Sequence, residues 1–208
     1  MKIGICGGTF DPFHRGHIEP VLAAREAMQW DRLLYFVAYQ QPFKENGCSV
    51  SSYHRFAMAV LATEAMGDVW VSSWELEREG TSYTVDTLEQ LRSQYPDATL
   101  DWIIGDDNLA RLGEWKRIDR IFELANFVVL TRVAPGVAAE AGGATPDCVC
   151  DAETRPRHGA IVYAHNTTIP ISSTEIRQRI RAGESIDALV DPRVSRYIQH
   201  NRLYQETP

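Results

Sequence analysis

Two histidines stand three residues apart, shortly after a pair of glycines near the start of the chain. Gly7 and Gly8 follow a short apolar run, and residues without a Cβ let the backbone come close to a ligand. His14 and His17 lie where a helix is expected to begin, so their imidazoles share one face and can donate to phosphate oxygens. Because a helix N-terminus also attracts anions, the pattern predicts a phosphate site suited to a phosphoryl or nucleotidyl transition state. Either histidine alone would more often be packed or solvated.

Residues 171–177 contain a second pattern of the same kind. Three hydroxyl residues open a helix, Ser172, Ser173 and Thr174, and Arg177 follows one turn later, where a guanidinium can bridge phosphate oxygens. With Glu175, the same residues also match an ordinary capping box beside a solvated arginine, which in isolation is the commoner case. We call these two phosphate-binding segments the first cradle (residues 7–17) and the second cradle (residues 171–177). Two such cradles at the carboxyl ends of strands fit a nucleotide lying across an open sheet. The first pattern is neither the Gly-x-Gly-x-x-Gly dinucleotide fingerprint nor the Gly-Lys-Ser/Thr phosphate loop.

Short apolar runs alternate along the chain with segments of helical periodicity. This alternation is typical of an α/β protein with a doubly wound, mainly parallel sheet and helices on both faces. The strands are expected at 3–6, 33–39, 69–72, 100–104, 127–131 and 160–163, and the helices at 17–28, 51–66, 83–95, 118–124, 172–181 and 191–203.

The length of 208 residues predicts one domain spanning 1–208, since a chain of this size buries a sufficient core. Residues 132–160 are rich in proline and glycine and lack periodicity, so we expect a surface excursion there. Residues 172–208 are expected to form a small helical C-terminal part that completes the nucleotide site.

Composition and charge exclude several classes of protein. The 44% hydrophobic and 24% charged residues are those of a globular chain, and a net charge of -7 argues against broad binding of nucleic acid or anionic membranes. No stretch approaches the roughly 18 apolar residues of a membrane span. The four cysteines are too few for a disulfide framework, and Cys148-Val-Cys150 lacks the second ligand pair of a structural zinc site. We expect a cytoplasmic protein, and the sequence leaves open whether it is a monomer or a homo-oligomer.

The two cradles resemble the two signatures of the HxGH nucleotidyltransferase superfamily, which has a Rossmann-like fold. The first covers residues 8–17, ending in His14-x-Gly16-His17, and the second covers residues 171–177. Further motifs narrow the resemblance to the bacterial nicotinate-nucleotide adenylyltransferases (NaMN adenylyltransferases). They are Pro42-Phe43-Lys44, residues 77–88, Ile104-Gly105-Asp106-Asp107 and Leu112-x-x-Trp115. The likeness runs in the family's order along nearly the whole chain, except 132–160.

This resemblance implies adenylyl transfer from ATP to nicotinate mononucleotide (NaMN), a step of NAD biosynthesis that yields deamido-NAD and pyrophosphate without a covalent enzyme intermediate. It implies catalytic roles for His14 and His17, and Mg²⁺ bound mainly through the ATP phosphates. It assigns ATP binding to Gly7, Gly8, Thr9, His14, His17, Gly105, Asp107, Ser172, Ser173, Thr174 and Arg177. It assigns acceptor binding to Thr9, Lys44, Ser82, Tyr83, Thr84 and Trp115. Helix capping is an equal alternative for Asp107, and packing is the ordinary use of a tryptophan such as Trp115.

One position departs from the family pattern, and several other functions compete with the implied one. Phe43 stands where the family often has histidine, and its apolar ring cannot donate to a phosphate. Related enzymes use nicotinamide mononucleotide, phosphopantetheine or glycerol phosphate as acceptor, whereas Ser82-Tyr83-Thr84 and Trp115 favour nicotinate. A non-catalytic nucleotide sensor on the same fold would have lost the histidines. The missing dinucleotide fingerprint disfavours a doubly wound oxidoreductase.

Overall fold

The computed structural model describes residues 1–43, 47–130, 158–164, 166 and 169–205. The predicted excursion at 132–160 lies almost wholly outside these residues, as do Lys44, Cys148 and Cys150. The chain folds as two compact units. Unit 1 consists of Met1–Cys6, Pro20–Leu33 and Tyr83–Ile169, and unit 2 of Gly7–Glu19, Leu34–Ser82 and Pro170–Pro208.

Six strands form one sheet in the order β3-β2-β1-β4-β5-β6. They are β1 (Lys2–Gly8), β2 (Arg32–Val37), β3 (Val69–Ser72), β4 (Thr99–Gly105), β5 (Asn126–Leu130) and β6 (Ile161–Ala164). β4 pairs in parallel with β1 and β5, and β5 pairs in parallel with β6. This strand order is that of a doubly wound nucleotide-binding sheet, in which the order reverses between β1 and β4. The predicted α/β, doubly wound, mainly parallel class is therefore confirmed.

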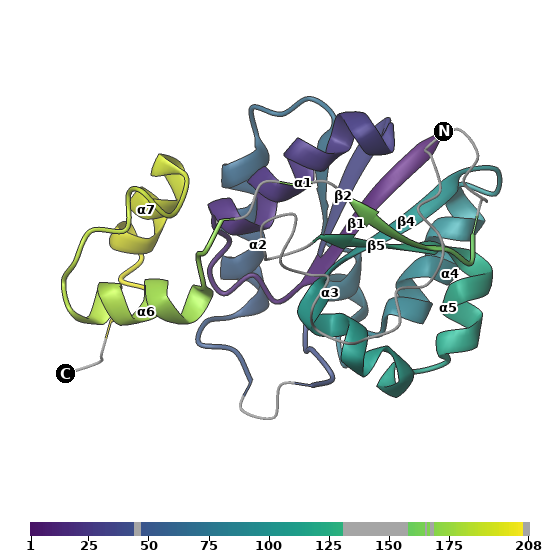
Figure 1. Cartoon of the computed structure of the whole chain (residues 1–208). Coiled ribbons are helices and arrows are strands. Elements are labelled where there is room, and N and C mark those ends of the chain that lie inside the picture. Colours follow the sequence, from purple (N-terminus) through teal and green to yellow (C-terminus); the bar gives the residue numbers. More distant parts are fainter. Residues whose placement is uncertain (44–46, 131–157, 165, 167–168, 206–208) are drawn as a thin grey trace. The chain divides into compact units, whose positions relative to one another are not determined.

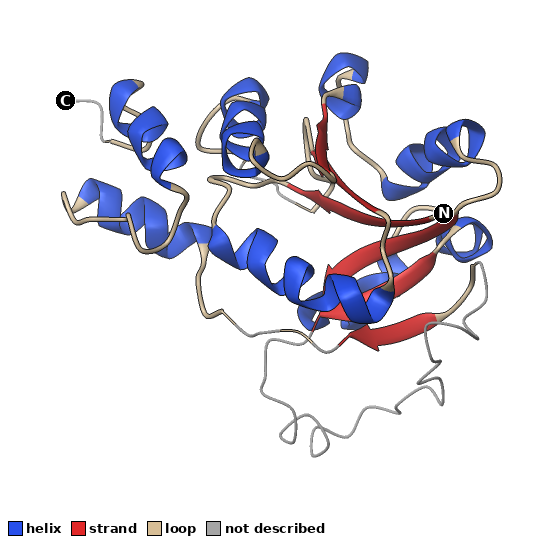
Figure 2. Cartoon of the chain, turned by 90° about the horizontal axis from the view of Figure 1, so that it is seen from above, coloured by secondary structure: helices blue, strands red, loops and turns tan. Residues whose placement is uncertain are grey.

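The helices follow the predicted alternation with ends shifted by a few residues (Figure 2). They are α1 (Arg15–Met28), α2 (Ser52–Thr63), α3 (Trp74–Arg78), α4 (Thr84–Gln94), the 3₁₀ helix η1 (Asp106–Glu114), α5 (Ile118–Leu124), α6 (Ser173–Arg181) and α7 (Pro192–His200). The sequence did not predict α3 or η1, because one is too short to show periodicity and the other has the tighter 3₁₀ repeat. None of the helices in the described residues combines the length and apolar character that a membrane span requires.

Unit 1 is held together by apolar packing and one buried chain of polar groups. The part of α1 in this unit lies on one face of the strands, and α4 and α5 lie on the other (Figure 1). Asp101 on β4 is fully buried and accepts hydrogen bonds from Trp30 Nε1 at 2.6 Å and Asn126 Nδ2 at 3.0 Å. Asn126 Oδ1 in turn accepts from Ala160 N at 3.0 Å. Because each of these buried polar groups has a hydrogen-bond partner, the network joins β4 to the first residue of β5 and to the residue before β6.

Unit 2 contains the C-terminal helices, which lie side by side in both views (Figures 1 and 2). α7 contacts α2, where Tyr197 Oη and His54 Nδ1 are 3.0 Å apart. Asp191 caps α7, since its carboxylate accepts from Arg193 N at 2.8 Å, and Pro192 occupies the first helical turn. The predicted C-terminal helical segment therefore does contain two helices, both tied to the rest of their unit.

Candidate active site

The first cradle is the loop that leads from β1 into α1. A Cβ on Gly8 would lie 2.7 Å from the ring of Phe10, so any larger residue there would displace that buried ring. Phe10 itself has a left-handed backbone with φ 52°, which a bulky residue adopts only where its surroundings enforce it. The Gly8 carbonyl accepts from Ala38 N at 2.9 Å. The conformation of the loop is thus fixed by the packing of Phe10 and by the hydrogen bond from Ala38, which follows β2.

His14 and His17 lie together as predicted. Their rings stack with centroids 3.6 Å apart, and the backbone N–H of His14 donates to Nδ1 of His17 at 3.2 Å. In this arrangement Nδ1 of His17 is an acceptor, so the hydrogen of a neutral His17 ring belongs on Nε2. A Cβ on Gly16 would lie 3.1 Å from two atoms of the His14 ring. The glycine between the histidines therefore leaves room for the buried His14.

Aromatic rings fix the position of His17. Phe10 meets it edge-on at a centroid distance of 4.9 Å, and Phe13 lies 5.4 Å away. Tyr35 from β2 packs against both phenylalanines and donates its hydroxyl to the His17 carbonyl at 3.0 Å. Such aromatic contacts restrict the orientation of the imidazole. The sequence did not predict this support, because Tyr35 comes from a different strand.

The second cradle opens α6. Ser172 Oγ accepts from Glu175 N at 3.1 Å, which confirms the capping half of the predicted box. The carboxylate of Glu175 instead pairs with Arg179 at 2.8 Å. Ser172 and Thr174 are exposed and Arg177 is half-buried, so hydroxyls and a guanidinium gather at the N-terminus of this helix. This combination is able to bind phosphate oxygens.

The two cradles contact each other directly. Ser173 Oγ donates to the Pro12 carbonyl at 3.2 Å, and Arg177 Nη1 donates to the Asp11 carbonyl at 2.6 Å. These bonds join segments that are more than 160 residues apart in the sequence. Arg177 is therefore more than the solvated arginine of the simpler alternative. Unit 2 brings the predicted phosphate-binding loop and the predicted phosphate-binding helix into one site.

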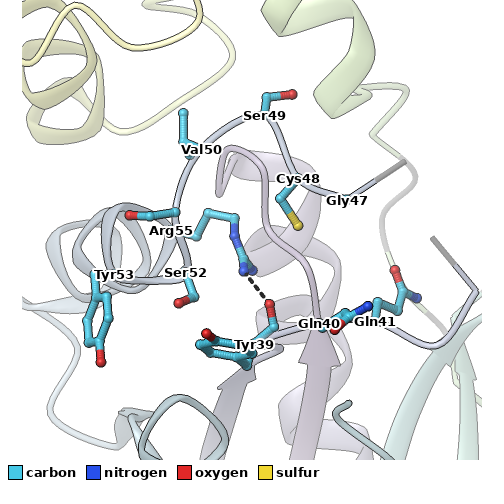
Figure 3. Close-up of a pocket in the computed structure, with 11 residues that line it drawn as sticks. Tyr39, Gln40, Gln41, Gly47, Cys48, Ser49, Val50, Ser52, Tyr53 and Arg55 are labelled. Carbon is cyan, nitrogen blue, oxygen red and sulfur yellow. Dashed lines mark hydrogen bonds between the residues drawn. The ribbon is translucent and has the colours of Figure 1, made fainter. Parts of the chain in front are cut away.

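Sequence reasoning missed Arg55, which is 1% exposed. Its Nη1 donates to the Thr9 carbonyl at 2.6 Å, and its Nη2 donates to the Tyr39 carbonyl at 3.1 Å (Figure 3). Burial lowers the pKa of this guanidinium from its usual value, against the opposing effects of Cys48, Asp11 and Tyr204. Arg55 thereby fixes the residues after β1 and after β2 relative to each other.

A pocket of about 430 Å³ lies beside Arg55 in unit 2 (Figure 3). Its lining comes from the two segments that flank residues 44–46, namely Tyr39, Gln40, Gln41, Gly47, Cys48, Ser49, Val50, Ser51, Ser52, Tyr53 and Arg55. Lys44, the predicted ligand of the acceptor phosphate, is outside the described residues. Thr9 Oγ1 donates to Gln41 Oε1 at 2.8 Å, so the first cradle also contacts this lining. Ser82 Oγ accepts from Tyr39 N at 3.0 Å, which leaves its hydroxyl hydrogen for a ligand.

The remaining predicted residues, Gly105, Asp107, Tyr83, Thr84 and Trp115, belong to unit 1. Gly105 is the N-cap of η1, and the exposed Asp107 accepts from Asn108 Nδ2 at 3.1 Å. The capping alternative for Asp107 is therefore wrong, because the cap position falls on the glycine before Asp106.

Trp115 and Tyr83 are both partly exposed in unit 1. The Trp115 ring packs edge-on against Phe127 at a centroid distance of 5.7 Å, so packing uses only part of its surface. The Lys116 ammonium lies 4.0 Å from the centre of the Tyr83 ring, next to the start of α4 at Thr84. Sequence reasoning missed this cation, although its position directly after Trp115 was a usable signal.

Comparison with known proteins gives the family. The Cytidylyltransferase-like family profile matches residues 5–179. A probable nicotinate-nucleotide adenylyltransferase of Gemmatimonas aurantiaca is 38% identical, covering 100% of this chain and 94% of the relative. A protein of the same description from Desulfatibacillum aliphaticivorans is 36% identical, covering 98% of this chain and 100% of the relative.

Solved structures show the same fold. A putative nicotinate-nucleotide adenylyltransferase from Vibrio parahaemolyticus matches with a TM-score of 0.66 at 20% identity, over 100% of this chain and 98% of the other. The nicotinic acid mononucleotide adenylyltransferase of Plasmodium falciparum complexed with NaAD matches with a TM-score of 0.67 at 18% identity, over 98% of this chain and 97% of the other. From the full-length sequence matches, the chain belongs to the cytidylyltransferase-like family and, within it, to the nicotinate-nucleotide adenylyltransferases.

Proposed function

We propose that this chain transfers the adenylyl group of ATP to NaMN, releasing pyrophosphate and forming deamido-NAD, as a step of NAD biosynthesis. A phosphate oxygen of NaMN forms a bond to the α-phosphorus of ATP, while the bond from that phosphorus to the pyrophosphate oxygen breaks. The observation that carries the proposal is the direct contact of the two cradles through Ser173 and Arg177. One polyanion spanning both cradles would meet a helix N-terminus and hydroxyls together.

The chain's own residues act by positioning and by stabilising charge. We propose that His14 and His17 donate to the ATP phosphates as negative charge grows on the departing pyrophosphate. The hydrogen bond that Nδ1 of His17 accepts from the His14 backbone supports this, because it makes Nε2 the donor nitrogen of the neutral ring. Arg177 and the hydroxyls of α6 would bind the phosphates on the other side. Gly7, Gly8 and Thr9 provide backbone and hydroxyl donors, and Gly105 with Asp107 would bind the ribose.

We propose that Mg²⁺ binds mainly through the ATP phosphates. Among the described residues, no three His, Cys, Asp or Glu side chains are arranged to hold a metal ion. Mg²⁺ is commonly held by phosphate oxygens with only one or two carboxylates, so a metal that arrives with ATP needs no cage in the protein. When bound there, it would neutralise part of the phosphate charge.

The acceptor would be recognised at both of its ends. We propose that Lys44 binds the mononucleotide phosphate and that Trp115 stacks on the pyridine ring. Ser82, Tyr83 and Thr84, with their backbone amides, would bind the nicotinate carboxylate. The nearby Lys116 adds a positive charge that favours a carboxylate over an amide.

Pyrophosphate release measured across candidate acceptors tests the proposal. With ATP and Mg²⁺, turnover should be much faster for NaMN than for nicotinamide mononucleotide, phosphopantetheine or glycerol phosphate. Equal rates with NaMN and the amide would contradict the nicotinate preference. ATP binding without pyrophosphate release for any acceptor would instead indicate a nucleotide sensor. We also propose a cytoplasmic location, because four cysteines in a chain of 208 residues are too few for the disulfide framework of a secreted protein.

A further inference from the structure

Asp11, in the loop of the first cradle, connects three distant segments of unit 2. The residue is 3% exposed. Its Oδ1 accepts from the Tyr204 hydroxyl at 2.9 Å, and its Oδ2 accepts from Ser49 N at 2.8 Å. Its backbone carbonyl accepts from Arg177 Nη1 at 2.6 Å. The same residue therefore touches the end of the chain, the loop after Lys44 and the arginine of the second cradle.

Arg177 depends on Asp11 for its orientation. Its two described hydrogen bonds are from Nη1 to the Asp11 carbonyl and from Nη2 to Thr174 Oγ1, the latter at the longer distance of 3.3 Å. A guanidinium has five donor hydrogens in a rigid plane, so these two bonds leave others for a phosphate but fix the plane in which they point. A shift of the Asp11 backbone would rotate that plane.

Tyr204 restrains Asp11 from the C-terminal end. Its side chain is 6% exposed, and its backbone is left-handed with φ 64°. A tyrosine adopts that conformation only where other contacts compensate for the strain. Burial, followed by the charge of Asp11, raises the pKa of the Tyr204 hydroxyl, so it stays protonated and remains a donor. Without this donor, a buried carboxylate oxygen would lose its partner and Asp11 would move toward other donors.

We propose that Tyr204 is a positioning residue for ATP: through Asp11, it holds Arg177 in the orientation that binds the ATP phosphates. The inference rests on the proposed function, because it takes Arg177 as a phosphate ligand. It assigns a role in the site to a residue outside both signatures. Tyr204 does not touch the substrate in this account and acts only through Asp11.

The chain offers a matched control for Tyr204→Phe. Tyr197 also places its hydroxyl in a hydrogen bond from the C-terminal segment, in this case 3.0 Å from His54 Nδ1. Tyr197→Phe removes the same chemical group and loosens the same segment without involving Asp11. A purely structural role of the C-terminal segment would make the two substitutions alike in their effects on ATP.

The experiment measures kcat, the two KM values and binding of α,β-methylene-ATP by calorimetry. Tyr204→Phe should raise KM for ATP and Kd for the analogue about 5- to 10-fold. This is less than the roughly 10- to 150-fold that a lost hydrogen bond to a charged group can cost, because the bonds of Arg177 to ATP are misaligned and not removed. kcat and KM for NaMN should stay within about twofold, as should all constants of Tyr197→Phe. Asp11→Asn, which replaces one acceptor oxygen by a donor group, should raise the same ATP constants and serves if Tyr204→Phe folds poorly.

A double-mutant cycle identifies the route. If Tyr204 acts through Arg177, adding Tyr204→Phe to Arg177→Lys should change Kd for the analogue by less than about twofold. Additive effects, or an unchanged analogue Kd in Tyr204→Phe and Asp11→Asn, would overturn the inference. Analogue binding needs no acceptor, so the two proposals fail separately. A wild-type protein that makes no deamido-NAD would refute the proposed function but leave this inference standing if the binding results hold.

Discussion

Gly16→Ala separates the geometry of the histidine pair from the stability of the fold. An alanine Cβ would lie 3.1 Å from Cε1 and Nδ1 of His14 and 3.5 Å from the Ile171 Cβ. Ordinary contacts begin at 3.4 Å, so the His14 ring, which stacks on His17, has to move by about the difference of 0.3 Å. Since a displacement of 1 Å in an active site costs about 100-fold, we expect kcat to fall about 3- to 10-fold.

Stability should move in the other direction or not at all. Alanine is better than glycine inside a helix by about 0.5–1 kcal/mol, and Gly16 is the second residue of α1, where the gain is smaller. Urea unfolding should therefore show an unchanged or slightly higher free energy of unfolding, while initial rates of pyrophosphate release fall.

Gly113→Ala is the control, because a Cβ there meets nothing within 4 Å. It should leave the rate unchanged, and because Gly113 lies in η1, its free energy of unfolding should be unchanged or slightly higher, as for Gly16→Ala. A Gly16→Ala protein with wild-type kcat would refute the reasoning, because the position of the His14 ring would then not matter for turnover.

Three other substitutions probe separate parts of the account. Arg55→Met leaves the buried carbonyls of Thr9 and Tyr39 without donors and should lower the free energy of unfolding by about 2–4 kcal/mol, measured in urea. Asp191→Ala removes the cap of α7 and should cost about 1 kcal/mol at pH 7. The hydrogen bond from Arg193 lowers the Asp191 pKa, so the part of its contribution that depends on its charge is complete above the unfolded pKa of about 3.9 and is lost as pH falls through the lower folded value. A cost of Asp191→Ala that does not decrease as the pH is lowered would contradict this. Phe43→His restores a donor and should lower KM for NaMN but not for ATP, whereas an unchanged KM for NaMN would show that the position is not used.

The sequence was sufficient for the fold class and for most elements, because alternating apolar runs and helical periodicity are local signals. The strand order was not predictable in the same way, since it depends on pairing between distant strands. α3 at Trp74–Arg78 and η1 at Asp106–Glu114 were missed because a short helix and a 3₁₀ helix lack the repeat that identifies longer α-helices.

The site was predicted where its residues lie in contiguous motifs, such as His14 with His17. The motifs did not predict the long-range contacts that hold the motif residues in position. Arg55 shares a helix face with Met58 and Ala62, both buried. A charged residue at such an apolar position indicated that buried hydrogen-bond acceptors must surround its guanidinium. The hydrogen bond from Tyr204 to Asp11 could not be predicted from a local sequence pattern, because it joins residues 193 positions apart.

The central claim is that adenylyl transfer to NaMN depends on the histidine pair. The direct measurement is deamido-NAD formed from ATP and NaMN by the wild-type protein and by His17→Ala, with the stability of both checked in urea. We expect one pyrophosphate per deamido-NAD from the wild type, and a loss of at least about 100-fold in His17→Ala with the fold intact. Undiminished formation of deamido-NAD by a folded His17→Ala protein would contradict the account.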